Sequence, residues 1–175
     1  MQTEDRFNTT PYTTIMISGG FDPVHSGHIR MIQDARNYGE VIVIVNSDAW
    51  LKRKKGYVFM PFEERCEIME AFEGVTHVMG VEDDDDTVCE ALKRVKPTYF
   101  GNGGDRTGDN TPEQDVCKEL NIEVIFELGG EKTQSSSQLV DNIGKTIARD
   151  EEEEYAISIR KWFNAKYNIK DDGIQ

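Results

Sequence analysis

Two histidines stand three positions apart in a chain that has only three. His25 and His28 lie in the stretch "SGGFDPVHSGH", which follows the β-branched run at 13–18 and includes the pair Gly19–Gly20. An imidazole can donate a hydrogen bond to a phosphate oxygen, and a protonated ring adds positive charge where negative charge builds up during phosphoryl transfer. The spacing therefore predicts two catalytic histidines that act on a phosphate under attack.

The segment around these histidines has the features of an anion site. Glycines at the end of a strand let the backbone approach a ligand closely, and a helix that begins near Ser26 points free N–H groups at the same place. Gly27 is expected to leave room for a bulky phosphate. Two other readings stay open. The histidines can be metal ligands, although the sequence offers no further ligand at a typical spacing, or they can be structural turn and cap residues.

The rest of the chain predicts the elements that must position this turn. Runs at 13–18, 41–47, 76–81, 98–102 and 122–128 are expected as strands, with helices between them. This alternation predicts an α/β fold, a Rossmann-like, doubly wound parallel five-stranded sheet with helices on both faces. The ligand site should lie at the carboxyl ends of the strands. His77 falls in the third strand and is given no role.

Composition limits the function classes. The chain has 175 residues and a net charge of −13, which argues against nucleic acid as a partner. No apolar run reaches the roughly 20 residues of a membrane span, so we expect no membrane insertion and a cytoplasmic protein. Cys66, Cys89 and Cys117 indicate neither a disulfide framework nor a zinc site, and are expected as buried, reduced thiols. The acidic runs at 82–86 and 150–154 are interpreted as solvated faces or helix N-termini.

The motif "GGFDPVHSGH" resembles the signature of the His-x-Gly-His nucleotidylyltransferase superfamily, in its cytidylyltransferase-like branch. The resemblance extends over residues 13–146, because "VNSDAWLKRKKG", "MPFEERCEIMEAF", "VKPTYFGNGGD" and "TQSSSQLV" follow in the family's order. It is closest to glycerol-3-phosphate cytidylyltransferases and to the heptose-phosphate adenylyltransferase domain. It implies transfer of CMP or AMP from a nucleoside triphosphate to a phosphorylated alcohol or sugar, with release of pyrophosphate and with Mg²⁺ held mainly by the triphosphate.

The resemblance also assigns residues to roles. Catalysis is assigned to His25, His28 and Lys55. Nucleotide binding is assigned to Gly19, Gly20, Phe21, Asp22, Gly27, Lys52, Gly104, Asp105, Ser135, Ser136 and Ser137. Acceptor binding is assigned to Asp48, Arg65 and Lys132.

Several of these residues also have an ordinary structural interpretation. The basic segment 52–55 is expected as a loop after the second strand, where it either holds the β- and γ-phosphates or is simply solvated. Arg65 can pair with a glutamate of its own helix. Asp48 and Asp105 can cap turns, and the three serines can cap a helix.

Three further expectations complete the prediction. The chain divides into a tail at 1–12, a nucleotidylyltransferase domain at 13–146 and a C-terminal helical extension at 147–175, with one or two helices at the end. A homodimer is expected. A pantetheine-phosphate or mononucleotide adenylyltransferase, or a nucleotide-binding module without catalysis, is the alternative function. The segment "GGEKTQ" at 129–134 lacks the Arg-Thr pair of glycerol-phosphate cytidylyltransferases, so ATP is a possible donor.

Overall fold

Five strands form one parallel sheet in the computed structural model, which describes residues 12–81, 84–104, 106, 111–131 and 133–167. The strands are β1 (Thr14–Gly19), β2 (Glu40–Val45), β3 (Val75–Gly80), β4 (Tyr99–Gly103) and β5 (Glu123–Leu128). Their order is β3-β2-β1-β4-β5, so the direction of winding reverses between β1 and β4. The predicted fold class is confirmed, and each strand lies within two residues of its predicted bounds.

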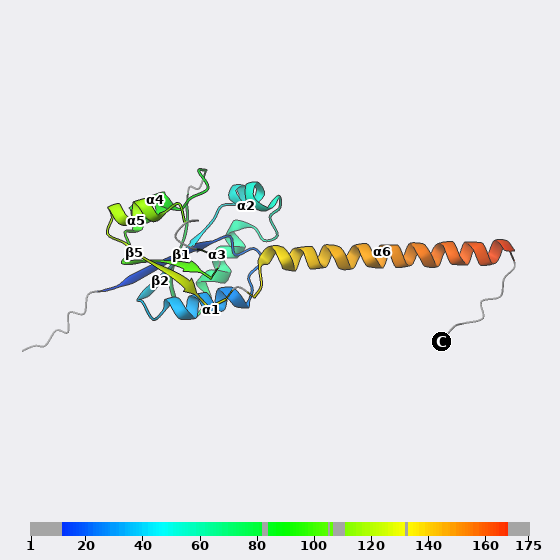
Figure 1. The fold of residues 1–175 in the computed structure, drawn as a ribbon, viewed down its shortest axis with the longest axis horizontal. Coiled ribbons are helices and arrows are strands. Elements are labelled where there is room, and N and C mark those ends of the chain that lie inside the picture. The colour runs from blue at the N-terminus through cyan, green and yellow to red at the C-terminus, as the bar shows by residue number, and fades with distance from the viewer. Residues whose placement is uncertain (1–11, 82–83, 105, 107–110, 132, 168–175) are drawn as a thin grey trace, which may run out of the picture. The chain divides into compact units, whose positions relative to one another are not determined.

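Helices cover both faces of the sheet (Figure 1). The helices of this part of the chain are α1 (Ser26–Ala35), α2 (Asp48–Lys55), α3 (Phe62–Glu70), α4 (Cys89–Val95) and α5 (Gln114–Glu119). Successive residues of β1 point to opposite faces, so Ile15 and Ile17 pack with α1 and α3 while Met16 packs with α4 and α5. The strands are therefore buried on both sides, which is why their sequences are continuously apolar.

The expectation of a basic loop at 52–55 is wrong, because these residues form the last turn of α2. Ser47 caps this helix by accepting the N–H of Trp50 at 3.0 Å, and Gly56 ends it in the left-handed conformation with φ +81°. Leu51 anchors α2 in the core with none of its surface exposed. Lysine and arginine are good helix formers, and both ends of the segment carry capping residues.

A single long helix, α6 (Ser136–Tyr167), follows the sheet. The chain separates into two compact units, residues 1–136 and 137–175, and α6 begins at the last residue of the first unit. The helical extension is therefore one continuous helix up to Tyr167. The proposed domain limits at residues 12 and 146 stay a prediction.

The three cysteines are free thiols, as expected, but only Cys117 is fully buried, and Cys66 and Cys89 are partly exposed. Burial raises the pKa of Cys117 to about 11, so this thiol is protonated and unreactive at neutral pH. His77 lies exposed on the edge strand β3. Within the described ranges, no helix has the length and apolar character that crossing a bilayer requires.

Candidate active site

The turn between β1 and α1 is tightly packed around one buried aromatic ring. Gly19 ends β1, and a Cβ atom at this position would lie 3.2 Å from the ring of Phe21, so glycine makes room for that ring. Phe21 is 1% exposed and has a positive φ of 49°. Its ring meets the imidazole of His28 edge-on, with 5.0 Å between the ring centroids. Phe21 therefore forms an apolar floor beneath the second histidine.

The two histidines cap the helix that they begin. His25 is the N-cap of α1, and its Nδ1 accepts the backbone N–H of Gly27 at 3.1 Å. The Nδ1 of His28 accepts the backbone N–H of His25 at 3.2 Å, which completes a reciprocal capping box. The structural reading of the motif and the catalytic one are thus compatible, because capping uses only one nitrogen of each ring.

This capping also fixes where the ring protons are. Since each Nδ1 accepts a hydrogen bond, the proton of each neutral imidazole is on Nε2, which makes both Nε2–H groups donors. The rings are stacked, with centroids 3.9 Å apart and planes 27° apart. The first turn of α1 contains no acidic residue, so nothing on the helix itself opposes an anion at its N-terminus. Both rings thus stand together at a helix end that favours negative charge.

Gly27 makes room for the ring of His25, and its predicted contact with the nucleotide stays a prediction. A Cβ atom on Gly27 would lie 2.8 Å from Cε1 of His25, so a larger residue at this position would displace that imidazole.

Asp22 ties the turn to the segment that precedes α3. It is fully buried, and its carboxylate accepts the backbone N–H groups of Phe59 at 2.8 Å and Met60 at 2.6 Å. Lys55, the last residue of α2, donates from Nζ to the backbone carbonyl of Asp22 at 3.0 Å. Of the predicted cations, Lys55 thus lies directly against the histidine turn.

Arg65 is a buried residue that connects the histidine turn to the end of β2 and the start of α2. No part of it is exposed, and its guanidinium donates to the carbonyl oxygens of Gly20 at 2.7 Å, Asn46 at 2.8 Å and Met60 at 3.0 Å. It also forms a 2.6 Å ion pair with Asp48 at the start of α2. These contacts are not the predicted pair within one helix. They favour a positioning role for Arg65 and Asp48, and acceptor binding by either residue stays a prediction.

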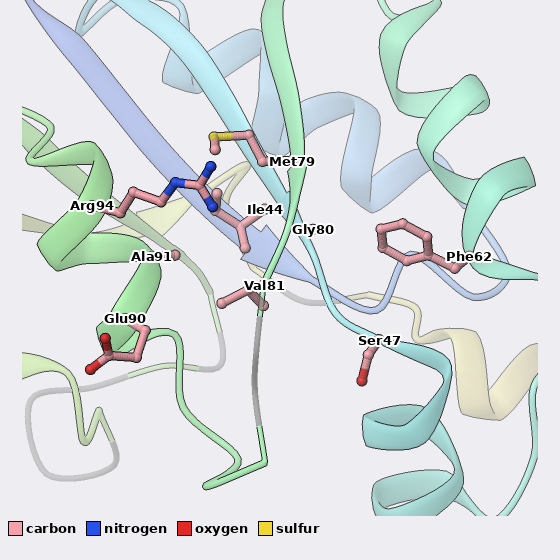
Figure 2. Close-up of a pocket in the computed structure, with 9 residues that line it drawn as sticks. All are labelled: Ile44, Ser47, Phe62, Met79, Gly80, Val81, Glu90, Ala91 and Arg94. Carbon is pink, nitrogen blue, oxygen red and sulfur yellow. The ribbon is translucent and has the colours of Figure 1, made fainter.

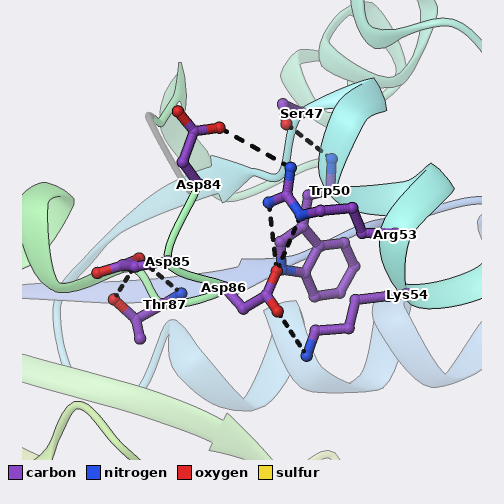
Figure 3. Close-up of polar contacts among 8 residues, drawn as sticks. All are labelled: Ser47, Trp50, Arg53, Lys54, Asp84, Asp85, Asp86 and Thr87. Carbon is purple, nitrogen blue, oxygen red and sulfur yellow. Dashed lines mark hydrogen bonds and ion pairs between the residues drawn. The ribbon is translucent and has the colours of Figure 1, made fainter.

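The four basic residues of α2 divide between two sides of the helix. Arg53 forms ion pairs with Asp86 at 3.2 Å and Asp84 at 3.8 Å, and Lys54 pairs with Asp86 at 3.1 Å (Figure 3). Lys52 lies exposed one turn before Lys55. Asp84 and Asp86 of the first acidic run thus form ion pairs with α2, so these two residues are not merely solvated. Lys52 and Lys55 are left on the side that includes the histidine turn.

Ser136 connects the serine segment to the histidine turn. Ser136 is 7% exposed, and its Oγ donates to the carbonyl oxygen of Pro23 at 2.9 Å. Ser135 precedes it, half-buried, and Ser137 belongs to the second unit of the chain. Gly104 lies exposed just after β4. The predicted residues Asp105 and Lys132 lie outside the described residues.

Asn102 is a residue of interest that the sequence interpretation missed. It lies at the carboxyl end of β4, beside the switch point of the sheet, and is 8% exposed. Its Nδ2 is buried and finds no hydrogen-bond partner among the described residues. A buried amide without a partner is uncommon and calls for an explanation. The signal available in the sequence was a polar residue at the end of a buried strand, directly before two glycines.

A parallel sheet of this order, with paired imidazoles at its first turn, defines a nucleotide-handling Rossmann-like protein. The family model described as cytidylyltransferase-like matches residues 16–158, and the chain belongs to this family of nucleotidyltransferases. The sequence-based family assignment is confirmed.

Relatives among curated proteins agree with this. The chain is 35% identical over 111 residues to the bifunctional protein HldE of a Nitratiruptor species, a match that covers 62% of this chain and 24% of that protein. It is 31% identical over 132 residues to the bifunctional protein HldE of Aliarcobacter butzleri, covering 73% of this chain and 27% of that protein. The chain thus spans about a quarter of the length of these relatives.

Solved structures support the fold. The lipopolysaccharide core biosynthesis protein of Thermoplasma volcanium superposes with a TM-score of 0.55 at 20% identity, covering 66% of this chain and 95% of that one. A bifunctional NMN adenylyltransferase/ADP ribose pyrophosphatase of Francisella tularensis gives 0.53 at 16% identity, covering 73% of this chain and 41% of that one.

Proposed function

We propose that this protein transfers a nucleoside monophosphate from a nucleoside triphosphate to a phosphomonoester and releases pyrophosphate. The observation that carries the proposal is the stacked pair of His25 and His28, whose Nδ1 atoms are both engaged by backbone N–H groups. Two Nε2–H donors at one helix N-terminus match the charge that develops on an α-phosphate under attack.

The chemistry needs no covalent enzyme intermediate. An oxygen of the acceptor phosphate, already ionised at neutral pH, attacks the α-phosphorus, a new P–O bond forms, and the bond to the β-phosphate oxygen breaks. The bonding electrons leave with pyrophosphate. The protein contributes positioning and charge stabilisation: His25 and His28 donate to the α-phosphate, and Lys55 follows the leaving pyrophosphate. Nucleotide contacts by the Gly19–Asp22 turn, Lys52 and the serines are part of the same proposal.

The donor is proposed to be ATP and the acceptor a sugar phosphate. The relatives named HldE and the resemblance of "NSDAWLKRKKG" and the Gly-Gly-Asp turn to the heptose-phosphate adenylyltransferase domain both support this choice. CTP with a phospho-alcohol is the second choice, because the family model that matches is named for cytidylyltransferases. We propose that Mg²⁺ enters as part of the nucleotide substrate, held by phosphate oxygens and water, as is usual for this ion.

A screen of the purified full chain tests the proposal. Each of the four nucleoside triphosphates is mixed in Mg²⁺ with hexose 1-phosphates, heptose 1-phosphates, glycerol 3-phosphate, pantetheine 4′-phosphate and nicotinamide mononucleotide, and pyrophosphate is measured. We expect release with ATP and a sugar 1-phosphate, and none when either is omitted. Release with every triphosphate but no dependence on an acceptor would indicate a hydrolase and contradict the proposal.

A further inference from the structure

Arg30 brings a guanidinium to the edge of the histidine turn. It belongs to the second turn of α1, and long side chains in a helix lean toward the helix N-terminus. Its Nη2 lies 3.9 Å from the point where a Cβ atom on Gly27 would stand, and that point is 2.8 Å from Cε1 of His25. The guanidinium of Arg30 and the imidazole of His25 therefore border the same position on the first turn of α1.

A hydrogen bond holds this guanidinium against the segment that leads to the serines. Nη2 of Arg30 donates to Oγ1 of Thr133 at 3.1 Å. The same segment is fastened to α1 one turn further along, where the carboxylate of Asp34 accepts the backbone N–H of Gly129 at 3.0 Å. Arg30 and Asp34 are four residues apart and hence on one side of α1. Arg30 thus lies where the first turn of α1 meets the segment before the serines.

The charge of Arg30 stands near the helix end that disfavours a cation. Unpaired backbone N–H groups make a helix N-terminus partly positive, so a cation there is stabilised only when an anion joins it. The first turn of α1 contains no acidic residue that could be this anion. Thr133 accepts from one of the five N–H donors of the guanidinium, which leaves donors in the fork geometry that suits phosphate oxygens. A polyphosphate would satisfy both the guanidinium and the helix end.

The cavity beside α4 is a poor alternative place for a polyphosphate. It has a volume of about 590 Å³ and lies at the carboxyl ends of β2 and β3 (Figure 2). Its walls are mainly apolar, with Ile44, Met79 and Val81 among the lining residues, and its charged lining residues Glu90 and Arg94 have opposite signs. Several phosphate charges would lose their hydration there without matching cations. The terminal phosphates of a nucleotide therefore fit better beside Arg30.

We propose that Arg30 binds the β- and γ-phosphates of the donor nucleotide, while His25 and His28 donate to its α-phosphate. Thr133 is then a positioning residue, because it holds the guanidinium and not the nucleotide. Arg30 and Lys55 supply two cations, from α1 and α2, for the charge that leaves with pyrophosphate. This inference rests on the proposed function and deepens it by adding a phosphate-binding residue from outside the histidine motif.

Binding of a matched pair of nucleotides to the full chain tests this assignment. α,β-Methylene ATP and AMP share the nucleoside and the α-phosphorus and differ in the terminal phosphates. Calorimetry in Mg²⁺ gives the Kd of each, and the cytidine pair takes their place if the screen finds CTP as the donor. We expect Arg30→Gln to weaken binding of the triphosphate analogue at least about tenfold, the size of one lost charge-assisted hydrogen bond, and to leave AMP unchanged.

Two further variants separate charge from structure. Arg36→Gln removes a positive charge from the other end of α1, about 15 Å from its N-terminus and beyond the Debye length of about 8 Å at physiological salt, so both Kd values should stay unchanged. Thr133→Val removes only the hydrogen-bond acceptor and should weaken the triphosphate analogue less than Arg30→Gln does.

Four results would overturn the inference: no binding of the triphosphate analogue to the unsubstituted protein, an unchanged Kd in Arg30→Gln, an equal loss for AMP, or an equal loss in Arg36→Gln or Thr133→Val. The readout is equilibrium binding, which a protein that releases no pyrophosphate can still show. The inference and the proposed function can therefore fail separately.

Discussion

The two ring nitrogens of His25 and of His28 have different functions in this account: Nδ1 caps α1, and Nε2–H is the proposed donor to the phosphate. Nδ1 satisfies a backbone N–H at the start of α1, and this leaves the proton of the neutral ring on Nε2. A side chain of another type can replace the capping function without replacing the Nε2–H donor. The structural and catalytic contributions of these residues are therefore separable by substitution.

His25→Ala removes the cap and should lower the free energy of unfolding by about 1 kcal/mol, the usual cost of losing an N-cap. His25→Asn should restore most of that stability, because asparagine is among the best N-cap residues. Urea unfolding followed by circular dichroism measures both variants. Equal stability of His25→Ala and the unsubstituted protein would show that the ring does not cap α1.

Arg65→Gln should destabilise the fold far more than an ordinary surface substitution. It leaves the carbonyl oxygens of Gly20, Asn46 and Met60 without a strong donor and breaks the pair with Asp48. We expect a loss of about 3 kcal/mol in the free energy of unfolding. Lys93→Gln, which breaks an exposed pair, should cost less than about 1 kcal/mol in the same urea titration. Similar small losses in both variants would contradict the bracing role.

At this scale the sequence predicted that His25 and His28 lie together at the start of a helix, but not the partners of Arg65. The spacing of His25 and His28 is local, so the motif itself carries the information. Arg65 contacts residues 17 to 45 positions away, and such contacts depend on how β1, β2 and α3 pack. The Nδ2 of Asn102, which has no hydrogen-bond partner within the part of the chain that the structure describes, likewise becomes evident only once β4 is placed beside β1.

Among the elements, α2 differs most from the sequence-based expectation, because residues 52–55 are helical. Four consecutive basic residues suggest a solvated loop when charge alone is considered, although the caps Ser47 and Gly56 flank a run of good helix formers. As a helix, α2 presents Lys55 to the histidine turn and presents Arg53 and Lys54 to the acidic loop before α4. The strands were predicted closely because buried parallel strands have a continuous apolar sequence, which is a strong local signal.

The contact between α2 and the acidic loop should depend on pH. Hydrogen bonds from Lys54 and Arg53 lower the pKa of Asp86 below its ordinary value of 3.8. A lowered pKa means that the contact is complete above pH 3.8 and is lost as the pH falls through the lower, folded-state value. Trp50 lies three and four residues before Arg53 and Lys54, hence on the same side of α2, and reports this change.

Acid titration of Trp50 fluorescence in a Trp162→Phe background measures the effect, since the chain has two tryptophans. We expect a transition below pH 3.8 that is absent in Asp86→Asn. Asp85→Asn is the control, because Asp85 bonds to Thr87 within its own loop rather than to α2. A transition that is unchanged in Asp86→Asn would show that this contact does not hold α2.

At the scale of the whole molecule, the homodimer expected from the sequence remains a prediction. Within α6, large apolar side chains are exposed, including Ile143 at 52%, Ile147 at 54% and Trp162 at 60%. Exposed apolar residues in this number favour burial against another surface, which in the predicted homodimer is a second copy of this chain.

Sedimentation equilibrium of the full chain should give twice the mass of one chain. Replacing Ile143 and Ile147 with glutamate should shift the protein toward the monomer, because a charged side chain is costly to bury. Replacing the exposed Lys145 with glutamate is the control for added negative charge. A monomer at all micromolar concentrations would contradict the predicted homodimer.

Turnover by a variant that keeps the caps but lacks the imidazoles tests the central claim most directly. His25→Asn keeps an N-cap acceptor, and His28→Gln keeps the residue type that completes a capping box, so the double variant should fold with near-normal stability. With ATP and the acceptor found in the screen, we predict that its kcat for pyrophosphate release falls at least about 10²-fold, the size of losing one oxyanion donor. A kcat within about threefold of the unsubstituted protein would contradict the account.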